Sequence, residues 1–403
     1  MTRDESARPA VARSLVSSVY FPTFLFEIGI GAVYPILALT AIHLGASAAV
    51  ASAAVGSYAL GRMIGSAFGG LVAARWGSPS GALAGMAWTS GAALVCAASG
   101  ALPAFIGGAL LIGVGHALVH VSRQSQVVER VTFDYRARAL TTLAGIWRIA
   151  NFIGPLAGAV VIHHYGLRWA FVFAALAMAC GGVALAATGA RSDGIHAPAA
   201  RQIGPLGVAR ANRRILSTLG LAVGLTGAVR AARLAALPLW AAHLGLADGT
   251  TSVVFAVSAA VDMVLFFPAG YVMDRRDRRW TALPSTLLLA AGILALPLTS
   301  GVAGLTLAAI VIGVGNGWGS GLLMTLGSDV SPAEVRHVFL GLWMMLQDAG
   351  GLVGPAIISA GALAALPVGI VAVGAMGIAA TGLLARWIPP RRGGDAERLP
   401  DPG

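Results

Sequence analysis

The sequence contains no lysine: all 27 of its basic residues are arginine. It also has little charge of either sign, because charged residues make up 11% of the chain against about 25% in a typical soluble protein. Hydrophobic residues make up 57%, and the mean hydropathy is +0.81, which is more apolar sequence than a soluble core can bury. This composition excludes an ordinary soluble protein and indicates a membrane protein.

Cysteine is scarce, and the common catalytic motifs are missing. Cys96 and Cys180 both lie in apolar runs, so we interpret them as small core residues rather than a disulfide or a metal site. The sequence has no phosphate-binding loop, no Ser-His-Asp arrangement and no His-Glu-x-x-His motif. We therefore expect neither an enzyme nor an ATP-driven pump, and no resident cofactor or metal.

Twelve apolar stretches are each long enough to cross a bilayer, which takes about 20 residues. Glycine and proline are frequent inside them, as expected in transmembrane helices. We predict an all-α integral membrane protein with twelve transmembrane helices. The stretches fall at about residues 15–42, 49–73, 80–100, 104–127, 139–163, 169–190, 215–242, 251–273, 281–299, 303–328, 338–361 and 367–387.

Arginine is distributed unevenly among the loops. One set of alternate loops, together with both chain ends, holds 21 of the 27 arginines, whereas the opposite set holds only Arg168. Because positive loops stay on the cytoplasmic side, we expect both termini in the cytoplasm and membrane lipid, not nucleic acid, as the partner of this basic chain. Abundant alanine, glycine and arginine suggest a GC-rich bacterial genome, and hence the bacterial cytoplasmic (inner) membrane.

Short motifs recur at a fixed offset of 200 residues, which indicates that a six-helix unit has been duplicated. The longest polar segment lies between the two copies. We predict an N-terminal six-helix bundle (1–190), a cytoplasmic linker (191–214), a parallel C-terminal bundle (215–388) and a cytoplasmic tail (389–403). The recurring residues are Gly113-Val114-Gly115 with Gly313-Val314-Gly315, Arg136 with Arg336, Leu140 with Leu340, and Gly154-Pro155 with Gly354-Pro355.

A charged motif follows the eighth apolar stretch, and a weaker copy follows the second. The strong copy, at residues 270–279, reads Gly-Tyr-Val-Met-Asp-Arg-Arg-Asp-Arg-Arg. The weak copy, at residues 70–79, reads Gly-Leu-Val-Ala-Ala-Arg-Trp-Gly-Ser-Pro. Both resemble the loop motif Gly-x-Leu-Ala-Asp-Arg-x-Gly-Arg-Arg of the major facilitator superfamily. The resemblance covers nearly the whole chain and implies a transporter of the alternating-access type. It implies gating roles for Gly270, Asp274 and Arg275, and for Gly70, Arg75 and Gly77 in the first half, where Ala74 replaces the motif's aspartate.

The fifth span resembles the Gly-x-x-x-Gly-Pro-x-x-Gly-Gly motif of the superfamily's antiporters at Gly154, Pro155 and Gly158. Ala159 departs from it. Such a helix is thin on one face and is bent at its proline. Ordinary packing of small residues is the alternative interpretation, and Gly354-Pro355 is the repeat counterpart.

Four charges inside the spans are related by the repeat. Arg62 aligns with Asp262, and Arg148 aligns with Asp348, so equivalent positions carry opposite charges. In the resembling family, span 2 packs against span 11 and span 5 against span 8. We therefore predict two ion pairs between the bundles, Arg62 with Asp348 and Arg148 with Asp262; independent, locally satisfied charges are the alternative.

Three further charges lie in the spans that line the central cavity of the resembling family. Glu27 is in the first span, and Arg230 and Arg233 are one turn apart in the seventh. A carboxyl group in a poorly solvated cavity can take up and release a proton near neutral pH, so Glu27 is our candidate proton site. Contact with a cationic substrate and a structural bridge to Arg230 are alternatives, and the arginines are candidates for binding an anionic group.

Two histidines of the fourth span, His116 and His120, lie on one helix face. Their spacing suits a metal, but no carboxylate or cysteine stands near them in the sequence, so we interpret them as cavity-lining or hydrogen-bonded residues. Asn316, the repeat counterpart of His116, is a candidate substrate contact. Trp147 and Trp343 are interpreted as membrane-interface anchors.

Together these features predict a secondary active transporter that exports a small organic molecule or drug by proton antiport. We expect the proton as coupling ion, a small-molecule substrate and a monomer. Import or facilitated passage of a small organic anion is the alternative suggested by the two arginines and the histidines. A receptor or sensor with the same fold is the third.

Overall fold

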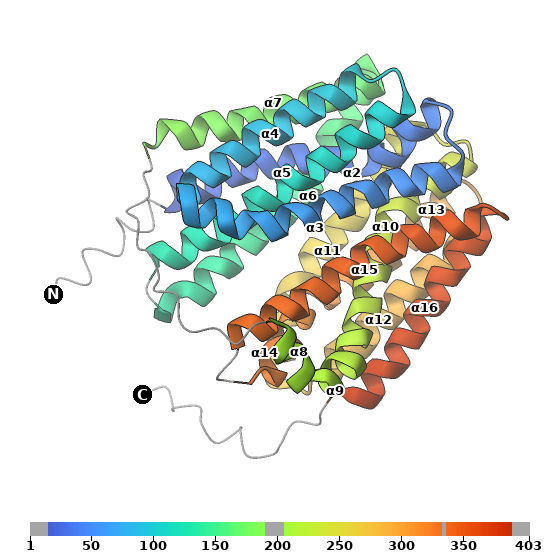
Figure 1. The fold of residues 1–403 in the computed structure, drawn as a ribbon. Helices are drawn as coiled ribbons and strands as arrows, with labels where there is room; N and C mark the ends of the chain where they lie inside the picture. Colours follow the sequence, from blue (N-terminus) through green and yellow to red (C-terminus); the bar gives the residue numbers. More distant parts are fainter. Residues whose placement is uncertain (1–14, 132, 190–204, 333–335, 389–403) are drawn as a thin grey trace.

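The computed structural model describes residues 15–131, 133–189, 205–332 and 336–388, and every regular element in these ranges is helical (Figure 1). The first half contains η1 (Val16–Tyr20), α2 (Phe21–His43), α3 (Ala48–Trp76), α4 (Ser78–Ala98), α5 (Leu102–Arg130), α6 (Phe133–Tyr165) and α7 (Leu167–Ala187). The second contains α8 (Pro205–Ala211), α9 (Arg213–Ile215), η2 (Leu216–Gly220), α10 (Leu221–His243), α11 (Asp248–Arg275), α12 (Arg279–Ala295), η3 (Leu296–Leu298), α13 (Gly301–Trp318), α14 (Leu322–Val330), α15 (Arg336–Ala362) and α16 (Leu366–Trp387).

Ten helical segments of the described chain are long and apolar enough to cross a membrane. Two more helices, α3 with 29 residues and α15 with 27, exceed the length of about 20 residues that a bilayer requires and lie among the ten. Large apolar side chains such as Leu176 and Val183 point outward, as suits contact with lipid. The predicted all-α fold of twelve membrane helices is confirmed.

The cysteines divide between the inside and the outside of this bundle. Cys96 is buried, as expected for a small core residue, and its thiol lies 3.8 Å from the carbonyl oxygen of Phe105. Cys180 is exposed on α7, so its interpretation as a core residue is wrong. An apolar run alone does not tell which face of a membrane helix meets lipid.

The two halves repeat each other closely in structure. The pair η1 and α2 covers residues 16–43, and η2 and α10 cover 216–243, an offset of 200 residues. In both halves the first long helix packs against the fifth and sixth, the second against the fourth, and the third against the fourth and sixth. The 200-residue repeat seen in the sequence therefore corresponds to two copies of one packing arrangement.

Close helix contacts recur at the same offset. A methyl group on Gly154 would collide with backbone atoms of Ile28 and Ala32, and one on Gly354 with backbone atoms of Ala228 and Ala232. Each of these glycines lets the fifth helix of its half approach the first. Packing is thus the structural role of both glycines.

The halves meet along α3 with α15 and along α6 with α11. We call the end of the molecule where α7 ends and α8 begins the linker side, and the opposite end the far side. Three polar contacts between the halves lie toward the far side: the Ser52 hydroxyl donates to the Pro355 carbonyl (2.7 Å), the Ser359 hydroxyl donates to the Ala49 carbonyl (2.8 Å), and His43 bonds to Asp248 (2.8 Å).

The tenth span is broken, although the sequence predicts one continuous helix there. Helix α13 ends at Trp318 and α14 begins at Leu322, with Gly321 in the left-handed region at φ +73°. The equivalent α5 of the first half is continuous from Leu102 to Arg130. Glycine tolerates this backbone conformation without the strain that a side chain would add, which permits the break. Inside a membrane, irregular backbone is found where it is buried in protein or lines a cavity.

Candidate functional site

Glu27 and His116 form a buried pair inside the first half. Glu27 lies on α2 and His116 on α5, and their side chains are only 3% and 2% exposed, respectively. Glu27 Oε1 lies 3.2 Å from His116 Nε2. A charged carboxylate would be costly in this environment, so the pair can hold a proton between the two groups.

A chain of hydrogen-bonding groups leads away from this pair. The other ring nitrogen of His116, Nδ1, lies 2.5 Å from the Tyr58 hydroxyl. That hydroxyl lies 3.2 Å from the hydroxyl of Tyr34, to which it can donate. Because both tyrosines line a cavity between the halves, the chain connects Glu27 to that cavity.

His120 completes a cluster that the sequence did not predict. Its candidate ligand atom and those of Glu27 and His116 all lie within 4.8 Å of one another, so the fold joins a carboxylate to the two histidines although none stands near them in the sequence. Glu27 comes from another helix, 89 residues from His116 in sequence. The ring of His120 also stacks on Trp147 at 3.7 Å, which makes Trp147 a partner of the cluster rather than an interface anchor.

Carboxylate and imidazole groups suit a transition-metal ion. Here, however, both ring nitrogens of His116 already face partners, and Arg62 acts electrostatically on Glu27 and on both histidines. The nearby positive charge would oppose a second cation. We therefore treat the cluster as a hydrogen-bonded proton site.

The central cavity has a volume of about 280 Å³ and lies between the two halves. Helices α2 and α3 line it from the first half, and α10, α14 and α15 from the second. Three of its lining residues are charged: Arg62, Arg230 and Asp348. The other lining residues include Tyr34, Val55, Tyr58, Ala59, Gly227, Ala231, Leu234, Leu323, Gln347, Gly351 and Pro355.

The structure brings Arg148 and Asp262 together across the interface of α6 and α11. Arg148 Nη1 donates to Asp262 Oδ1 at 2.6 Å. The side-chain amide of Asn316 donates to the other carboxylate oxygen at 2.7 Å. Asp262 is therefore satisfied on both oxygens, and Asn316 orients this ion pair instead of lining the central cavity.

The structure does not bring Arg62 and Asp348 together. Within the described residues no ion pair joins them, although both line the central cavity. The predicted pair is thus absent from this conformation, because the cavity separates α3 from α15 at this level. Closer to the far side the same helices are in contact, with Ala59 Cβ 3.9 Å from the position a Cβ on Gly351 would take.

Arg230 and Arg233 lie on α10, and neither reaches Glu27. Arg230 Nη2 donates to the carbonyl of Gly319 at 2.8 Å, an acceptor that the break between α13 and α14 exposes. Its Nε has no partner among the described residues. Arg233 lies in electrostatic range of Asp262 and Tyr34. The alternative of a Glu27–Arg230 bridge is therefore wrong for this conformation.

The Gly-Pro motifs contribute to packing in different ways. Gly154 and Gly354 pack inside their own halves, and Pro155 is buried within α6. Pro355 instead faces the other half, where its carbonyl accepts from Ser52 and its ring lies 3.6 Å from the Cβ position of Gly56.

The loop motifs lie on the linker side. Gly70 is on α3, Arg75 is exposed near the end of that helix, and Gly77 joins α3 to α4 at φ +83°. A methyl group on Gly270 would meet no neighbour. Asp274 and Arg275 end α11, and their side chains fall outside the described part, so their gating role stays a prediction.

The basic end of the motif at residues 270–279 is bound within its own half. Arg278 Nε donates to Asp329 at 2.9 Å and its Nη1 to the Met273 carbonyl, and Arg279 Nη2 donates to the Ile388 carbonyl at 2.7 Å. These contacts tie the turn after α11 to the ends of α14 and α16. They stabilise the second half and do not reach the first.

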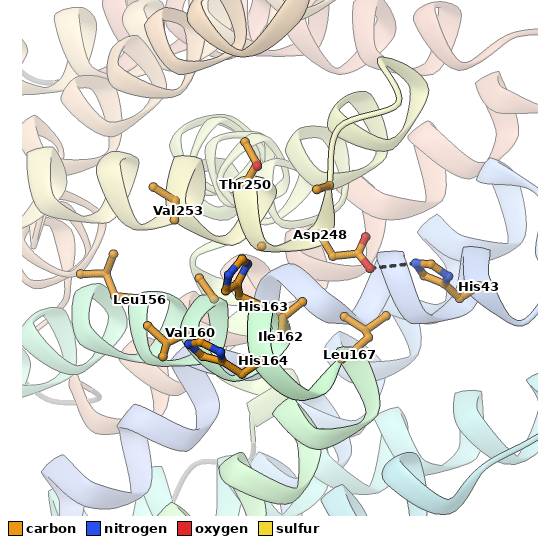
Figure 2. A pocket seen from close by; sticks show the side chains of 14 residues that line it. His43, Leu156, Val160, Ile162, His163, His164, Leu167, Asp248, Thr250 and Val253 are labelled. Carbon is orange, nitrogen blue, oxygen red and sulfur yellow. Dashed lines mark hydrogen bonds and ion pairs between the residues drawn. The ribbon is translucent and has the colours of Figure 1, made fainter.

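A second cavity, of about 900 Å³, lies at the far side between the end of α6 and the start of α11 (Figure 2). His163 and His164 line it, and the His43–Asp248 contact closes one edge. It is larger than the central cavity but lies away from the buried charges. We therefore place the functional site in the central cavity, where charged groups of both halves converge.

Sequence reasoning missed several residues of this site. Tyr34 and Tyr58 looked like ordinary aromatic residues of apolar spans, and only the packing of α2, α3 and α5 reveals their shared chain. The far-side contact of His43 with Asp248 was also missed. His43 ends α2 and Asp248 begins α11, and polar residues at the ends of spans are candidates for contacts between the halves. Trp343, predicted as an interface anchor, is 1% exposed and donates to the Leu323 carbonyl.

Known structures share this fold over almost their whole length. The nucleoside transporter NupG superposes with a TM-score of 0.74 at 12% identity, covering 91% of this chain and 97% of that one. A POT family transporter in complex with 5-aminolevulinic acid gives 0.73 at 12% identity, covering 92% and 95%. The D-xylose–proton symporter gives 0.68 at 14% identity, covering 92% and 98%.

No curated protein sequence matches the chain. The family model of the Major Facilitator Superfamily does match it, over residues 19–355, which is most of its length. With the repeated halves and the cavity between them, this match makes the protein a multi-pass membrane transporter and not an enzyme. The chain belongs to the major facilitator superfamily.

Proposed function

We propose that this secondary transporter couples the movement of a small organic molecule to the movement of protons. The hydrogen-bonded chain from Glu27 through His116 and Tyr58 to the central cavity supports this proposal. A proton held by the buried pair removes the carboxylate charge, and its loss restores that charge beside Arg62. Protonation and occupancy of the cavity are thereby coupled through one arginine.

Export by proton antiport is the first candidate. The antiporter-like motif at Gly154-Pro155 and the buried acid of α2 support it. In this scheme the protein is a monomer of the bacterial cytoplasmic membrane with both termini inside, as the arginine-rich loops indicate. The substrate would enter the cavity from the linker side, because the polar contacts between the halves lie toward the far side.

Uptake of an organic anion by proton symport is the second candidate. Arg62 lines the cavity and also acts on Glu27. Protonation of Glu27 would remove a negative charge that attracts Arg62, and Arg62 would then attract an anionic substrate more strongly. A proton and an anion would then bind together and move in the same direction.

One experiment tests the coupling and its direction. Purified protein is placed in vesicles that contain a pH-sensitive dye, and compounds that alter the growth of a sensitive host expressing the protein are added outside. Entry of a substrate should make the lumen alkaline under antiport and acidic under symport. The Glu27→Gln variant should lose this pH change and retain exchange of labelled for unlabelled substrate.

The control is Glu129→Gln, which changes a carboxyl group that accepts a hydrogen bond from Ser78 at the linker side of the same half. It should couple as the unmodified protein does. Unchanged proton movement in Glu27→Gln would remove Glu27 from the mechanism.

A further inference from the structure

The charged groups that line the central cavity form no ion pair among the described residues, unlike the charged groups nearby. An ionised side chain within a membrane span costs several kcal/mol unless it meets a partner or water. Asp262 is satisfied by Arg148 and Asn316. By contrast, Arg62, Arg230 and Asp348 form no ion pair within the described residues. The cavity therefore presents three charged groups to whatever fills it.

Two of these groups are positive and come from different halves. Arg230 is fixed by the Gly319 carbonyl and keeps a buried Nε without a partner. Arg62, on α3, forms no ion pair within the described residues, although Asp348 acts on it electrostatically. Two guanidinium groups that line one small cavity from different halves form a site for a carboxylate or a similar anion.

The third group is negative. The Asp348 carboxylate accepts no hydrogen bond from any residue in the described ranges, and its repeat counterpart, Arg148, is paired. A free carboxylate on the wall of the cavity favours an amine on the bound molecule. The remaining wall is largely apolar, with Tyr34, Leu234 and Leu323 available to contact a hydrocarbon body.

We infer that the transported molecule is small and amphoteric: its carboxylate or comparable anion binds Arg62 and Arg230, and its amine binds Asp348. This inference rests on the proposed function, since it takes the central cavity as the transport site. The cavity volume of about 280 Å³ lies at the lower end of the range of about 300–1,000 Å³ that is typical of ligand pockets. The bound molecule is therefore small, roughly the size of an amino acid.

Matched probes test the assignment by binding alone, with no proton gradient. Three series share the same apolar body: the amino acids leucine and phenylalanine, the carboxylic acids 4-methylpentanoate and 3-phenylpropanoate, and the amines isopentylamine and phenethylamine. Dissociation constants are measured on the purified protein from the shift of its melting temperature. Amino acids should bind best and amines least.

Variants assign each end of the probe. Asp348→Asn should weaken amino-acid binding about tenfold or more and leave carboxylic-acid binding unchanged or stronger, because a charged hydrogen bond is lost only in the first case. Arg230→Gln should weaken both series. Since Asp348 accepts no hydrogen bond and forms no ion pair within the described residues, its neutralisation should not lower the melting temperature of the ligand-free protein. Asp329→Asn, at the linker-side end of α14, is the control and should bind every probe as before.

Strongest binding of the amines, binding of none of the three series, or an Asp348→Asn variant with unchanged amino-acid affinity would each overturn the assignment. The failure would be separate from that of the proposed function. Proton coupling is measured with whichever compound the growth assay identifies, whatever its charge.

Discussion

The four repeat-related charges behave differently although the sequence treats them as equivalent. Arg148 and Asp262 are joined across α6 and α11, with side chains 20% and 12% exposed. Arg62 and Asp348 face a cavity at the equivalent place between α3 and α15. The pair Arg148–Asp262 therefore links the halves in this conformation, whereas Arg62 and Asp348 are available to a ligand.

A double-mutant cycle should reveal this asymmetry. Arg148→Gln, Asp262→Asn and the double variant should show a coupling free energy of about 1–3 kcal/mol in thermal unfolding, because the two groups are in direct contact and only partly exposed. The matched cycle of Arg62→Gln and Asp348→Asn should give a smaller coupling in the absence of substrate, because these two groups act on each other electrostatically but form no ion pair. Equal coupling in the two cycles would contradict the structure.

At the residue scale, the sequence located the right charges but could not pair all of them. The prediction succeeded for Arg148 and Asp262, because the repeat drew attention to both charges and the family resemblance placed span 5 against span 8. Glu27 and His116 lie in different spans, and nothing in either span indicates the other. Their contact depends on how α2 packs against α5, which only a three-dimensional structure supplies.

At the element scale, the break between α13 and α14 distinguishes the second half from the first. It places the Gly319 carbonyl where Arg230 can donate to it. A methyl group on Gly319 would collide with Arg230 Nη2 and with the Ser285 hydroxyl. The break therefore sets the position of one cationic group of the cavity.

Gly319→Ala should displace Arg230 and lower the melting temperature, since overpacking a tight site costs about 1–3 kcal/mol. It should also weaken binding of 3-phenylpropanoate, which the carboxylate-binding role of Arg230 predicts. The control is Gly382→Ala on α16, where an added methyl group would meet no neighbour. That variant should melt at the same or a higher temperature, because alanine is the better helix former by up to about 1 kcal/mol. Identical behaviour of the two variants would argue against the proposed contact.

The sequence predicted the helices well because the length of an apolar run decides whether a span can form. It failed at the break, because the glycines at 315, 317, 319 and 321 are equally typical of close helix packing. Gly315 and Gly317 do pack closely against α12 and α11, respectively, whereas Gly321 takes a left-handed backbone conformation. All these positions hold glycine, and the surrounding helices alone determine whether a glycine serves close packing or a break in the helix.

At the scale of the whole molecule, the two halves and their interface follow from the repeat, but the conformation does not. One sequence must serve every state of a transport cycle, so the state adopted here could not be predicted from it. The polar contacts Ser52–Pro355, Ser359–Ala49 and His43–Asp248 all join the halves toward the far side. Rocking of the halves would have to break these contacts for the cavity to open in that direction.

A reversible crosslink tests that motion. Ala59 and Gly351 face each other across α3 and α15, and their Cβ positions are 3.9 Å apart, within the range of about 3.5–4.5 Å that a disulfide requires. In a background with Cys96 and Cys180 replaced by alanine, oxidation of the Ala59→Cys/Gly351→Cys variant should stop transport, and reduction should restore it. The matched control crosslinks Met86→Cys to Gly182→Cys inside the first half, where the separation of the Cβ positions is 3.7 Å. Because each half moves as a rigid unit in this scheme, the control should transport equally well oxidised and reduced. Full transport by the oxidised α3–α15 crosslink would show that the halves do not separate there, and that the cavity opens to the far side by another route.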